Sequence, residues 1–318
     1  MIRKFLSKII IALLSLIITL GGLEIALRIF KASPLYEIRH GWHQYSKKNY
    51  YNSLVFRDKE HKIEKPQNTF RIVFVGDSFT EAYGVQFDKG YSQVLTSMLN
   101  QSSKDKQAEA IVCAKWGSNS IEELRFYKKK CEQFNPDVVV IGYVLNDIEG
   151  DKNDKERKEF LYSLQIFRPQ GVWYLFYEDS ALFRFFYLKK EYFRIRHAWI
   201  KGYNKWYGDT TEFRNVKRSL LEFKRLTSTK NQKLIVALLP TLDYELTDNN
   251  PFLRYYRLML DFLNENKIDS CYLYPYFNRK NTIELQVNPG YDSHPNDTGH
   301  QIIAKGLYDC LARIGVKP

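Results

Sequence analysis

Ser78 and His294 are the two residues whose types and surroundings most directly indicate nucleophilic chemistry. Ser78 follows an apolar run at 71–75 and a glycine, so its hydroxyl is expected on a turn from a strand to a helix, where the helix start favours negative charge. His294 lies two residues after Asp292, just before a helical pattern. An imidazole there can accept a proton from a serine hydroxyl if a neighbouring group, here Asp292, holds its other ring nitrogen. Taken singly, each residue also fits a plainer interpretation, a helix cap for Ser78 and a loop histidine for His294.

Two other loops are expected to meet Ser78, because the carboxyl ends of parallel strands lie at one edge of a sheet. Gly117 follows an apolar run at 110–114, and a glycine can bring its backbone N–H close to a bound oxygen. Asn146 follows the run at 137–143, and its amide can donate to an oxyanion that develops during a reaction. Alone, the first loop also fits a plain turn before a helix cap, and the second fits ordinary Asn-Asp turn chemistry.

The order of these segments resembles the conserved blocks of the SGNH hydrolase family, also called GDSL-like lipases and esterases. The four matching segments are GDSFTEAYGV at 76–85, AKWGSNS at 114–120, VLND at 144–147 and DSHPNDTGH at 292–300. The resemblance implies that Ser78 is the nucleophile, that Gly117 and Asn146 join Ser78 as oxyanion donors, that His294 is the base and that Asp292 orients it. It covers residues from about 71 to the C-terminus except a middle insertion, and it implies no metal or organic cofactor.

Two departures from the family pattern bear on these roles. Val144 stands where the third block commonly has glycine, which changes the local backbone. The last block commonly spaces its acid and base three residues apart, whereas Asp292 and His294 are two apart. Asp292 is therefore expected either to reach His294 from a different angle or to leave the orientation of the ring to a backbone carbonyl.

Apolar runs alternate with helical patterns along most of the chain. Strands are predicted at 71–75, 110–114, 137–143, 233–239 and 269–274, and helices at 91–100, 120–134, 211–229, 251–267 and 298–314. Strands that alternate with helices at this spacing predict a parallel sheet covered on both faces. The family resemblance implies the same α/β class, a three-layer α/β/α sandwich with a five-stranded parallel sheet.

The N-terminal residues 1–31 predict a membrane anchor. Three basic residues precede an uncharged stretch at 9–23, and the apolar character continues to Phe30 with Glu24 and Arg28 interrupting it. This run is close to the ~30 Å needed to cross a bilayer, and the basic flank predicts a cytoplasmic N-terminus with the rest of the chain outside the cytoplasm. A cleaved signal peptide is the competing interpretation. We therefore expect an anchor or signal peptide at 1–31, a juxtamembrane segment at 32–70, and a hydrolase-like domain at 71–318 with an insertion at 148–209.

Composition narrows the partners. The net charge of +12 favours anionic neighbours, but the chain has no recognisable nucleic-acid-binding module, so nucleic acid is not an expected partner. The 4 cysteines are widely spaced, which indicates buried free thiols rather than a disulfide framework, although three full pairings are open to an exported domain. The insertion is rich in aromatic and basic residues, and fits a helical cap with its own core, a sugar-binding wall, or a patch on an anionic membrane.

The sequence thus predicts a serine esterase that is a single-pass membrane protein with its catalytic domain outside the cytoplasm. Its expected substrate is an exported carbohydrate or lipid-linked molecule carrying an ester-linked acyl group, most simply acetyl. An O-acyltransferase that modifies a cell-envelope polysaccharide with the same residues is the main alternative. A non-catalytic glycan-binding protein on a decayed hydrolase scaffold is a third.

Overall fold

The structure is a computed structural model that describes residues 2–30, 51–103, 105–148, 155–164, 168–290 and 292–318. The chain divides into two compact units. The larger unit comprises the described residues of 43–158 and 200–318, and the smaller unit those of 1–42 and 159–199. The larger unit contains every residue that the sequence analysis assigned to the site.

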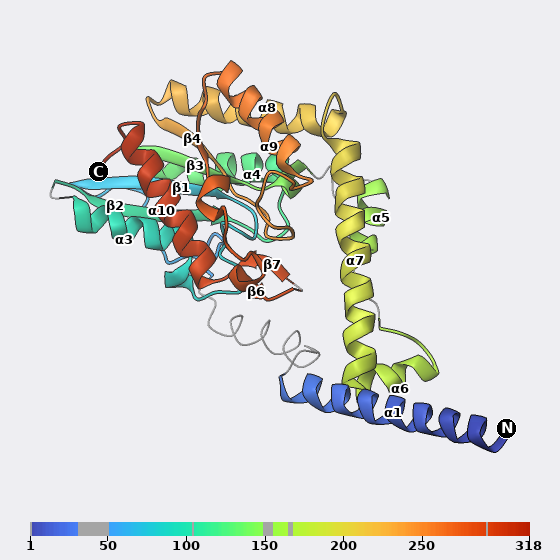
Figure 1. The fold of residues 1–318 in the computed structure, drawn as a ribbon. Helices are drawn as coiled ribbons and strands as arrows, with labels where there is room; N and C mark the ends of the chain where they lie inside the picture. Colours follow the sequence, from blue (N-terminus) through green and yellow to red (C-terminus); the bar gives the residue numbers. More distant parts are fainter. Residues whose placement is uncertain (1, 31–50, 104, 149–154, 165–167, 291) are drawn as a thin grey trace. The chain divides into compact units, whose positions relative to one another are not determined.

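A five-stranded sheet forms the centre of the larger unit (Figure 1). Its strands lie in the order β2-β1-β3-β4-β5 and all neighbouring pairs are parallel. The strands are β1 (Thr69–Gly76), β2 (Gln107–Ala114), β3 (Val138–Tyr143), β4 (Lys233–Leu238) and β5 (Asp269–Tyr272). The central strands are buried along nearly their whole length, because helices cover both faces and leave no polar side to the sheet. The predicted five-stranded parallel sheet is confirmed.

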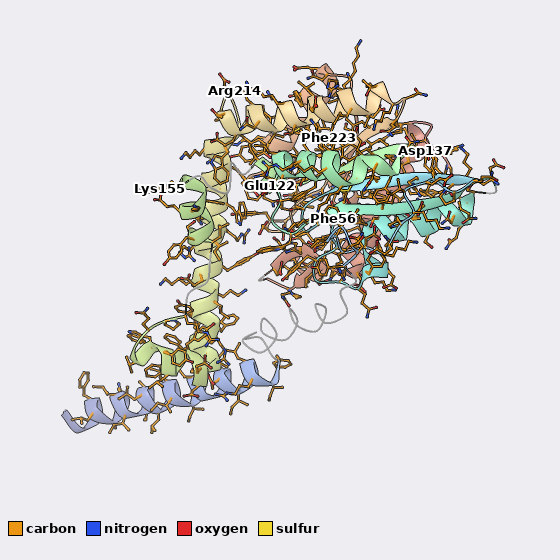
Figure 2. All side chains as sticks on the ribbon, turned by 180° about the vertical axis from the view of Figure 1, so that it is seen from behind. Phe56, Glu122, Asp137, Lys155, Arg214 and Phe223 are labelled. Carbon is orange, nitrogen blue, oxygen red and sulfur yellow. A yellow bond between two sulfur atoms is a disulfide. The ribbon has the colours of Figure 1, made fainter. Side chains whose placement is uncertain are left out.

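Helices pack on both faces of this sheet (Figure 1). Helices α3 (Tyr91–Ser102) and α10 (Asp297–Arg313) lie together on one face. Helices α4 (Ser120–Phe126) and α8 (Thr211–Thr229) lie together on the other, as Figure 2 shows for Glu122 of α4 and Phe223 of α8, and α9 (Leu253–Glu265) packs against β5. The predicted α/β/α layering is confirmed.

Three segments differ from the sequence-based expectation. Residues 78–84 after β1 form turns, and within the described stretch 51–103 the next α-helix begins only at Tyr91, so Ser78 does not stand at an α-helix start. The helix expected at 120–134 instead ends at Phe126 and continues as a π-helical turn and a 3₁₀ turn. A short antiparallel hairpin of β6 (Gln286–Asn288) and β7 (Asp292–Pro295), which no pattern predicted, precedes α10.

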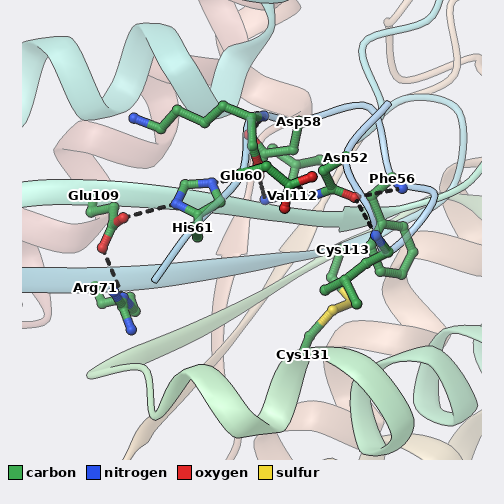
Figure 3. A network of polar contacts seen from close by, with 12 residues as sticks. Asn52, Phe56, Asp58, Glu60, His61, Arg71, Glu109, Val112, Cys113 and Cys131 are labelled. Atoms are coloured by element: carbon green, nitrogen blue, oxygen red, sulfur yellow. Dashed lines mark hydrogen bonds and ion pairs between the residues drawn. A yellow bond between two sulfur atoms is a disulfide. The ribbon is translucent and has the colours of Figure 1, made fainter. Parts of the chain in front are cut away.

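The cysteines form two disulfides, so the prediction of free thiols is wrong. Cys113 of β2 is bonded to Cys131 at the end of the π-helical turn, and Cys271 of β5 is bonded to Cys310 of α10 (Figure 3 shows the first). Each bridge joins a strand to a helix that packs on it. Wide spacing in the sequence concealed pairings that the α/β layers create.

The segment that precedes β1 is tied to the sheet by a buried polar network (Figure 3). The carboxylate of Asp58 accepts the backbone N–H of Val112 at 2.7 Å and contacts His61 at 3.0 Å. His61 contacts Glu109 at 2.8 Å, and Glu109 accepts from Arg71 at 2.8 Å. Burial alone lowers the pKa of His61, but its hydrogen bonds and ion pairs with the two carboxylates outweigh that effect and raise it.

The smaller unit contains α1 (Ile2–Ile29), α6 (Val172–Asp179), the second half of α5 (Lys155–Ser163) and α7 (Ala181–Trp206) up to residue 199. An 18-residue stretch within Phe5–Ile29 has a mean hydropathy of 2.4 and is not buried, so by length and composition α1 can cross a membrane or serve as a signal sequence. The insertion is helical where it is described and carries an aromatic cluster of Trp173, Phe176, Phe183 and Tyr187. Residues 31–50, 149–154 and 165–167 of the predicted segments lie outside the described residues, and the predicted domain boundaries stay a prediction.

Candidate active site

Three of the predicted site residues form a continuous chain of hydrogen bonds. The Nε2 atom of His294 lies 2.8 Å from the Oγ of Ser78, although the two residues are 216 positions apart. The Nδ1 atom of the same ring lies 2.5 Å from the Oδ1 of Asp292. One ring nitrogen therefore faces the hydroxyl and the other faces a carboxylate, which is the arrangement that lets an imidazole remove a proton from a serine.

The two-residue spacing of Asp292 and His294 is explained by strand β7. Side chains at positions i and i+2 of a strand point to the same face, so two residues suffice to bring the carboxylate beside the ring. The carboxylate also accepts the backbone N–H of His294 at 3.1 Å. Of the two expectations for this departure, Asp292 reaching the ring from its own direction is the one that the structure has.

Charge around His294 favours its protonated form. Burial lowers the pKa of the ring, but the charge and hydrogen bond of Asp292, with the charges of Asp77 and Asp243, outweigh burial and raise it above the ordinary value. The aromatic rings of Phe79 and Tyr83 lie 5.1 Å and 5.0 Å from the imidazole between ring centroids. The His294 ring is thus held both by a carboxylate and by aromatic packing.

Asn146 is placed beside Ser78 through Asp77, a residue to which the sequence analysis gave no role. The amide of Asn146 donates to the Oδ2 of Asp77 at 2.9 Å, and the Oδ1 of Asp77 accepts the N–H of Phe79 at 2.9 Å. Asp77 is completely buried, and burial raises its pKa although these hydrogen bonds act in the opposite direction. Its position beside Ser78 in the Gly-Asp-Ser triplet was the available signal.

Gly117 lies in the turn between β2 and α4, which is hydrogen-bonded to Gly76, the last residue of β1, two residues before Ser78. The carbonyl of Gly76 accepts the N–H of Lys115 and the hydroxyl of Ser118, both at 3.2 Å. Gly117 has a φ of +67°, a backbone conformation that favours glycine. Gly76 is itself required, because a Cβ there would lie 2.1 Å from the hydroxyl oxygen of Thr80.

A buried cluster of hydrogen bonds from charged side chains, also missed from the sequence, links the Ser78 loop to the Gly117 turn. Glu81 accepts the N–H of Trp116 at 2.5 Å and the hydroxyl of Tyr51 at 3.2 Å. Arg57 donates to the carbonyl of Glu81 at 3.2 Å and to that of Val85 at 2.6 Å, and also to the carbonyl between them at position 82. The turn after Ser78 is therefore held by side chains rather than by an α-helix.

Two buried acidic residues, Asp147 and Glu123, lie at the Asn146 loop. Asp147 accepts the N–H of Val144 at 2.7 Å, which closes the turn that carries Asn146. Glu123 of α4 is fully buried near Asp147 and Ser118. Burial, followed by the charge of Asp77, raises the pKa of Glu123 well above its usual value.

The described residues contain no group of three or more His, Cys, Asp or Glu side chains placed to hold a metal ion. The structure joins Ser78, His294 and Asp292 by hydrogen bonds, and it joins Asn146 to Asp77.

No family model matches the sequence, and no curated protein matches it. Several solved structures are similar. An acetylxylan esterase from Geobacillus stearothermophilus, in a catalytic mutant, has 15% identity over 78% of this chain and 94% of its own, with a TM-score of 0.47. A protein assigned as a GDSL-like lipase from Parabacteroides merdae has 14% identity over 79% and 99%, with a TM-score of 0.48. The acetyl xylan esterase AlAXEase has 16% identity over 76% and 99%, with a TM-score of 0.44. At these identities and TM-scores, the likeness gives no information about the reaction of this chain. A reaction is proposed below from the hydrogen-bonded geometry of Ser78, His294 and Asp292.

Proposed function

We propose that this protein is a serine esterase of the SGNH type that hydrolyses ester-linked acyl groups through an acyl-Ser78 intermediate. The observation that carries the proposal is the hydrogen-bond chain from Ser78 through His294 to Asp292, at 2.8 Å and 2.5 Å. A buried serine and histidine in contact can arise for structural reasons alone. A carboxylate on the far nitrogen of the ring, however, is what fixes its tautomer for proton transfer.

In the first half of the reaction His294 removes the proton of Ser78 as the Oγ attacks the carbonyl carbon of the ester. The carbonyl oxygen becomes an oxyanion, which we assign to the N–H groups of Ser78 and Gly117 and to the amide of Asn146. Asp77 accepts one N–H of that amide at 2.9 Å, and we assign the second N–H to the oxyanion. A donor of this kind typically lowers the barrier by ~2.7–4 kcal/mol. The intermediate collapses when protonated His294 gives its proton to the leaving alcohol.

The second half reverses these roles. His294 removes a proton from water, the hydroxide attacks acyl-Ser78, and the second oxyanion collapses to release the carboxylic acid. The proton returns from His294 to the Oγ of Ser78, so the enzyme ends as it began. Asp292 stabilises the imidazolium in both halves and remains charged throughout.

The substrate we propose is an exported carbohydrate or lipid-linked molecule with a small acyl group, acetyl in the simplest case. Helix α1, inserted in a membrane with its N-terminus in the cytoplasm, would place the larger unit outside the cytoplasm. Two disulfides support this location, because disulfides persist in oxidising compartments. The net charge of +12 supports a site near acidic glycans or anionic lipids.

The test uses the full-length chain in detergent with p-nitrophenyl acetate. Ser78→Ala and His294→Ala are each expected to lower the rate on the order of 10⁶-fold, to the level of the oxyanion donors alone. An organophosphonate probe should label the wild type once and leave Ser78→Ala unlabelled. Hydrolysis that persists in purified Ser78→Ala would exclude this mechanism.

The same preparation separates hydrolysis from acyl transfer. Wild-type protein that is labelled by the probe, yet turns over p-nitrophenyl acetate repeatedly only when a sugar hydroxyl is supplied, would be an O-acyltransferase with the same residues. Folded wild-type protein that is neither labelled nor active, but binds glycans, would be a binding protein.

A further inference from the structure

The polar groups near the end of α1 bind the junction of α6 and α7, within the smaller unit. The carboxylate of Glu24 accepts the backbone N–H groups of Ala181 and Leu182 at 2.8 Å and 2.7 Å and the hydroxyl of Ser180 at 3.0 Å. The guanidinium of Arg28 donates to Glu24 at 2.7 Å and also to the carbonyl of residue 179. The Glu24 carboxylate of α1 therefore caps the first turn of α7, and this contact holds the end of α6 beside the end of α1.

Helix α6 exposes apolar side chains although it is only 8 residues long. Val172, Trp173, Leu175 and Phe176 are between 49% and 60% exposed. A polar face is expected to cover a short surface helix in water, so consecutive exposed apolar residues of this size mark a surface that meets something other than water.

Membrane insertion of α1 sets the depth of this surface. Glu24 lies 19 residues after Phe5, which at 1.5 Å per residue is about 29 Å of helix. The hydrocarbon core of a bilayer is ~30 Å thick, so Glu24 reaches the boundary between acyl chains and headgroups when Phe5 lies at the opposite boundary. The contacts of Glu24 then hold α6 at that boundary, where tryptophan and tyrosine are enriched in membrane proteins.

An open groove of about 490 Å³ runs between α1 and the α6–α7 junction. Leu20 of α1, Leu175 and Phe176 of α6 and Leu182 of α7 line its apolar part, and Glu24 is at its polar part. A groove that is apolar towards the membrane interior and polar at the boundary matches the upper part of a lipid acyl chain. Trp173 stacks on Phe183 at 5.9 Å and extends the aromatic surface beside it.

We propose that α6 is an interfacial membrane helix, whose apolar side chains insert among the lipid acyl chains beside the outer end of α1. The proposal rests on the membrane insertion of α1 but not on esterase activity. The bilayer is the occupant that the observations favour, because the exposed surface of α6 continues the exposed apolar surface of α1, and because the depth of Glu24 coincides with the lipid boundary.

The experiment places the full-length protein in vesicles of phosphatidylcholine and phosphatidylglycerol. Alkaline-carbonate washing first establishes that α1 is inserted. Tryptophan fluorescence is then measured with lipids brominated on the acyl chain either near the headgroup or near the methyl end. The Trp173 component is the difference between wild type and Trp173→Phe. We expect strong quenching of this component by bromine near the headgroup and weaker quenching by bromine near the methyl end.

The matched control is Trp116→Phe, which removes a tryptophan of similar exposure, 56% against 57%, from the larger unit. This variant should keep the lipid-dependent quenching that Trp173→Phe loses. Washed, inserted protein whose Trp173 emission is insensitive to both lipids would overturn the proposal and indicate that a protein covers α6. Loss of quenching in Trp116→Phe instead would assign the lipid contact to the wrong unit and overturn it equally. Neither result depends on the hydrolysis of p-nitrophenyl acetate, so failure here is distinct from failure of the proposed reaction.

Discussion

In the proposed mechanism, the proton on His294 controls whether Ser78 can react. Burial lowers the pKa of the ring, but Asp292 above all raises it, so the base is free only above the ordinary range near 6.5. We predict that kcat/KM falls as the pH falls through a single ionisation with a midpoint above 6.5. A pH–rate profile with p-nitrophenyl acetate measures it, and Asp292→Asn should lower the midpoint and reduce the rate by roughly 10⁴-fold.

A second buried histidine provides the control for this profile. Burial lowers the pKa of His300 to about 3, so it stays neutral over the measured range, and its Nδ1 accepts the N–H of Tyr91 at 3.3 Å. His300→Asn keeps an acceptor there and should leave the midpoint unchanged. A midpoint at or below 6.5 in the wild type would contradict the arrangement around His294.

The same shift couples the activity of His294 to folding in a definite direction. A histidine with a raised pKa in the folded state stabilises the protein fully below the unfolded value of about 6.5. That contribution is lost as the pH rises through the folded pKa. The enzyme therefore gains its free base over the same pH range in which His294 ceases to stabilise the fold.

Glu123 is predicted to be neutral in the folded protein. Burial, followed by the charge of Asp77, raises its pKa well above the usual value, beside the turn that Asp147 closes around Asn146. Glu123→Gln supplies a neutral donor of the same shape and should retain stability and kcat. Glu123→Ala removes a fully buried side chain beside the Asn146 turn and should cost roughly 3 kcal/mol, with a lower kcat. Urea unfolding and steady-state kinetics test both, and a Gln variant as impaired as the Ala variant would mean that Glu123 is ionised.

Elements with one repeating pattern were predictable, and elements that depend on their neighbours were not. Helix α8 occupies the predicted residues Thr211–Thr229, because its buried residues repeat at helical spacing and Thr210 caps it. The helix that begins at Ser120 was predicted too long, since its continuation becomes a π-helical turn whose last residue is held to β2 by a disulfide. Strand β7 is 4 residues long and exists through its pairing with β6, so no local pattern shows it.

Helix α10 positions the base through its cap. The side chain of Asn296 accepts the N–H of Gly299 at 3.1 Å and donates to the carbonyls of Glu284 at 2.8 Å and Gln286 at 3.2 Å. It thus joins the helix start to the hairpin that carries His294. Asn296→Ala is predicted to lower the free energy of unfolding by about 1–2 kcal/mol and also to lower kcat, since the hairpin loses its tie to α10.

Thr210 caps α8 in the same way, accepting the N–H of Phe213 at 3.2 Å, and offers the matched variant. Thr210→Ala should lower the free energy of unfolding by about as much as Asn296→Ala does, without changing kcat per folded molecule. Equal kcat in the two variants would show that the Asn296 cap serves the fold only.

For the larger unit as a whole, two disulfides join the sheet to its helices. They close loops with sequence separations of 18 and 39 residues, for which loop entropy gives stabilisation of about 3 and about 4 kcal/mol. We predict that a reductant shifts the urea midpoint of the wild type sharply downward. The double variant Cys271→Ala and Cys310→Ala should start from a lower midpoint and shift less on reduction. A midpoint that does not respond to reductant would contradict both pairings.

For the whole molecule, the sequence predicted the α/β/α layers and the edge of the sheet at which the site lies. It did not predict the side chains that hold the site loops in place. Parallel strands place their carboxyl ends together whatever the loops contain, so Ser78, Asn146 and the Gly117 turn were expected there. Arg57 precedes the sheet by a dozen residues and has no pattern of its own, yet it holds the carbonyls of the turn after Ser78. Such contacts depend on tertiary structure, as the pairing of the cysteines does.

Asp292 and His294 can change their spacing only together with their backbone. One residue inserted between them would turn the carboxylate to the opposite face of β7, because neighbouring strand positions alternate. Reaching the three-residue spacing would therefore require the hairpin to become a turn in the same step. An intermediate that changed the spacing of Asp292 and His294 without changing the hairpin would have a misaligned histidine. Descendants of this protein should therefore keep the two-residue spacing and the hairpin together.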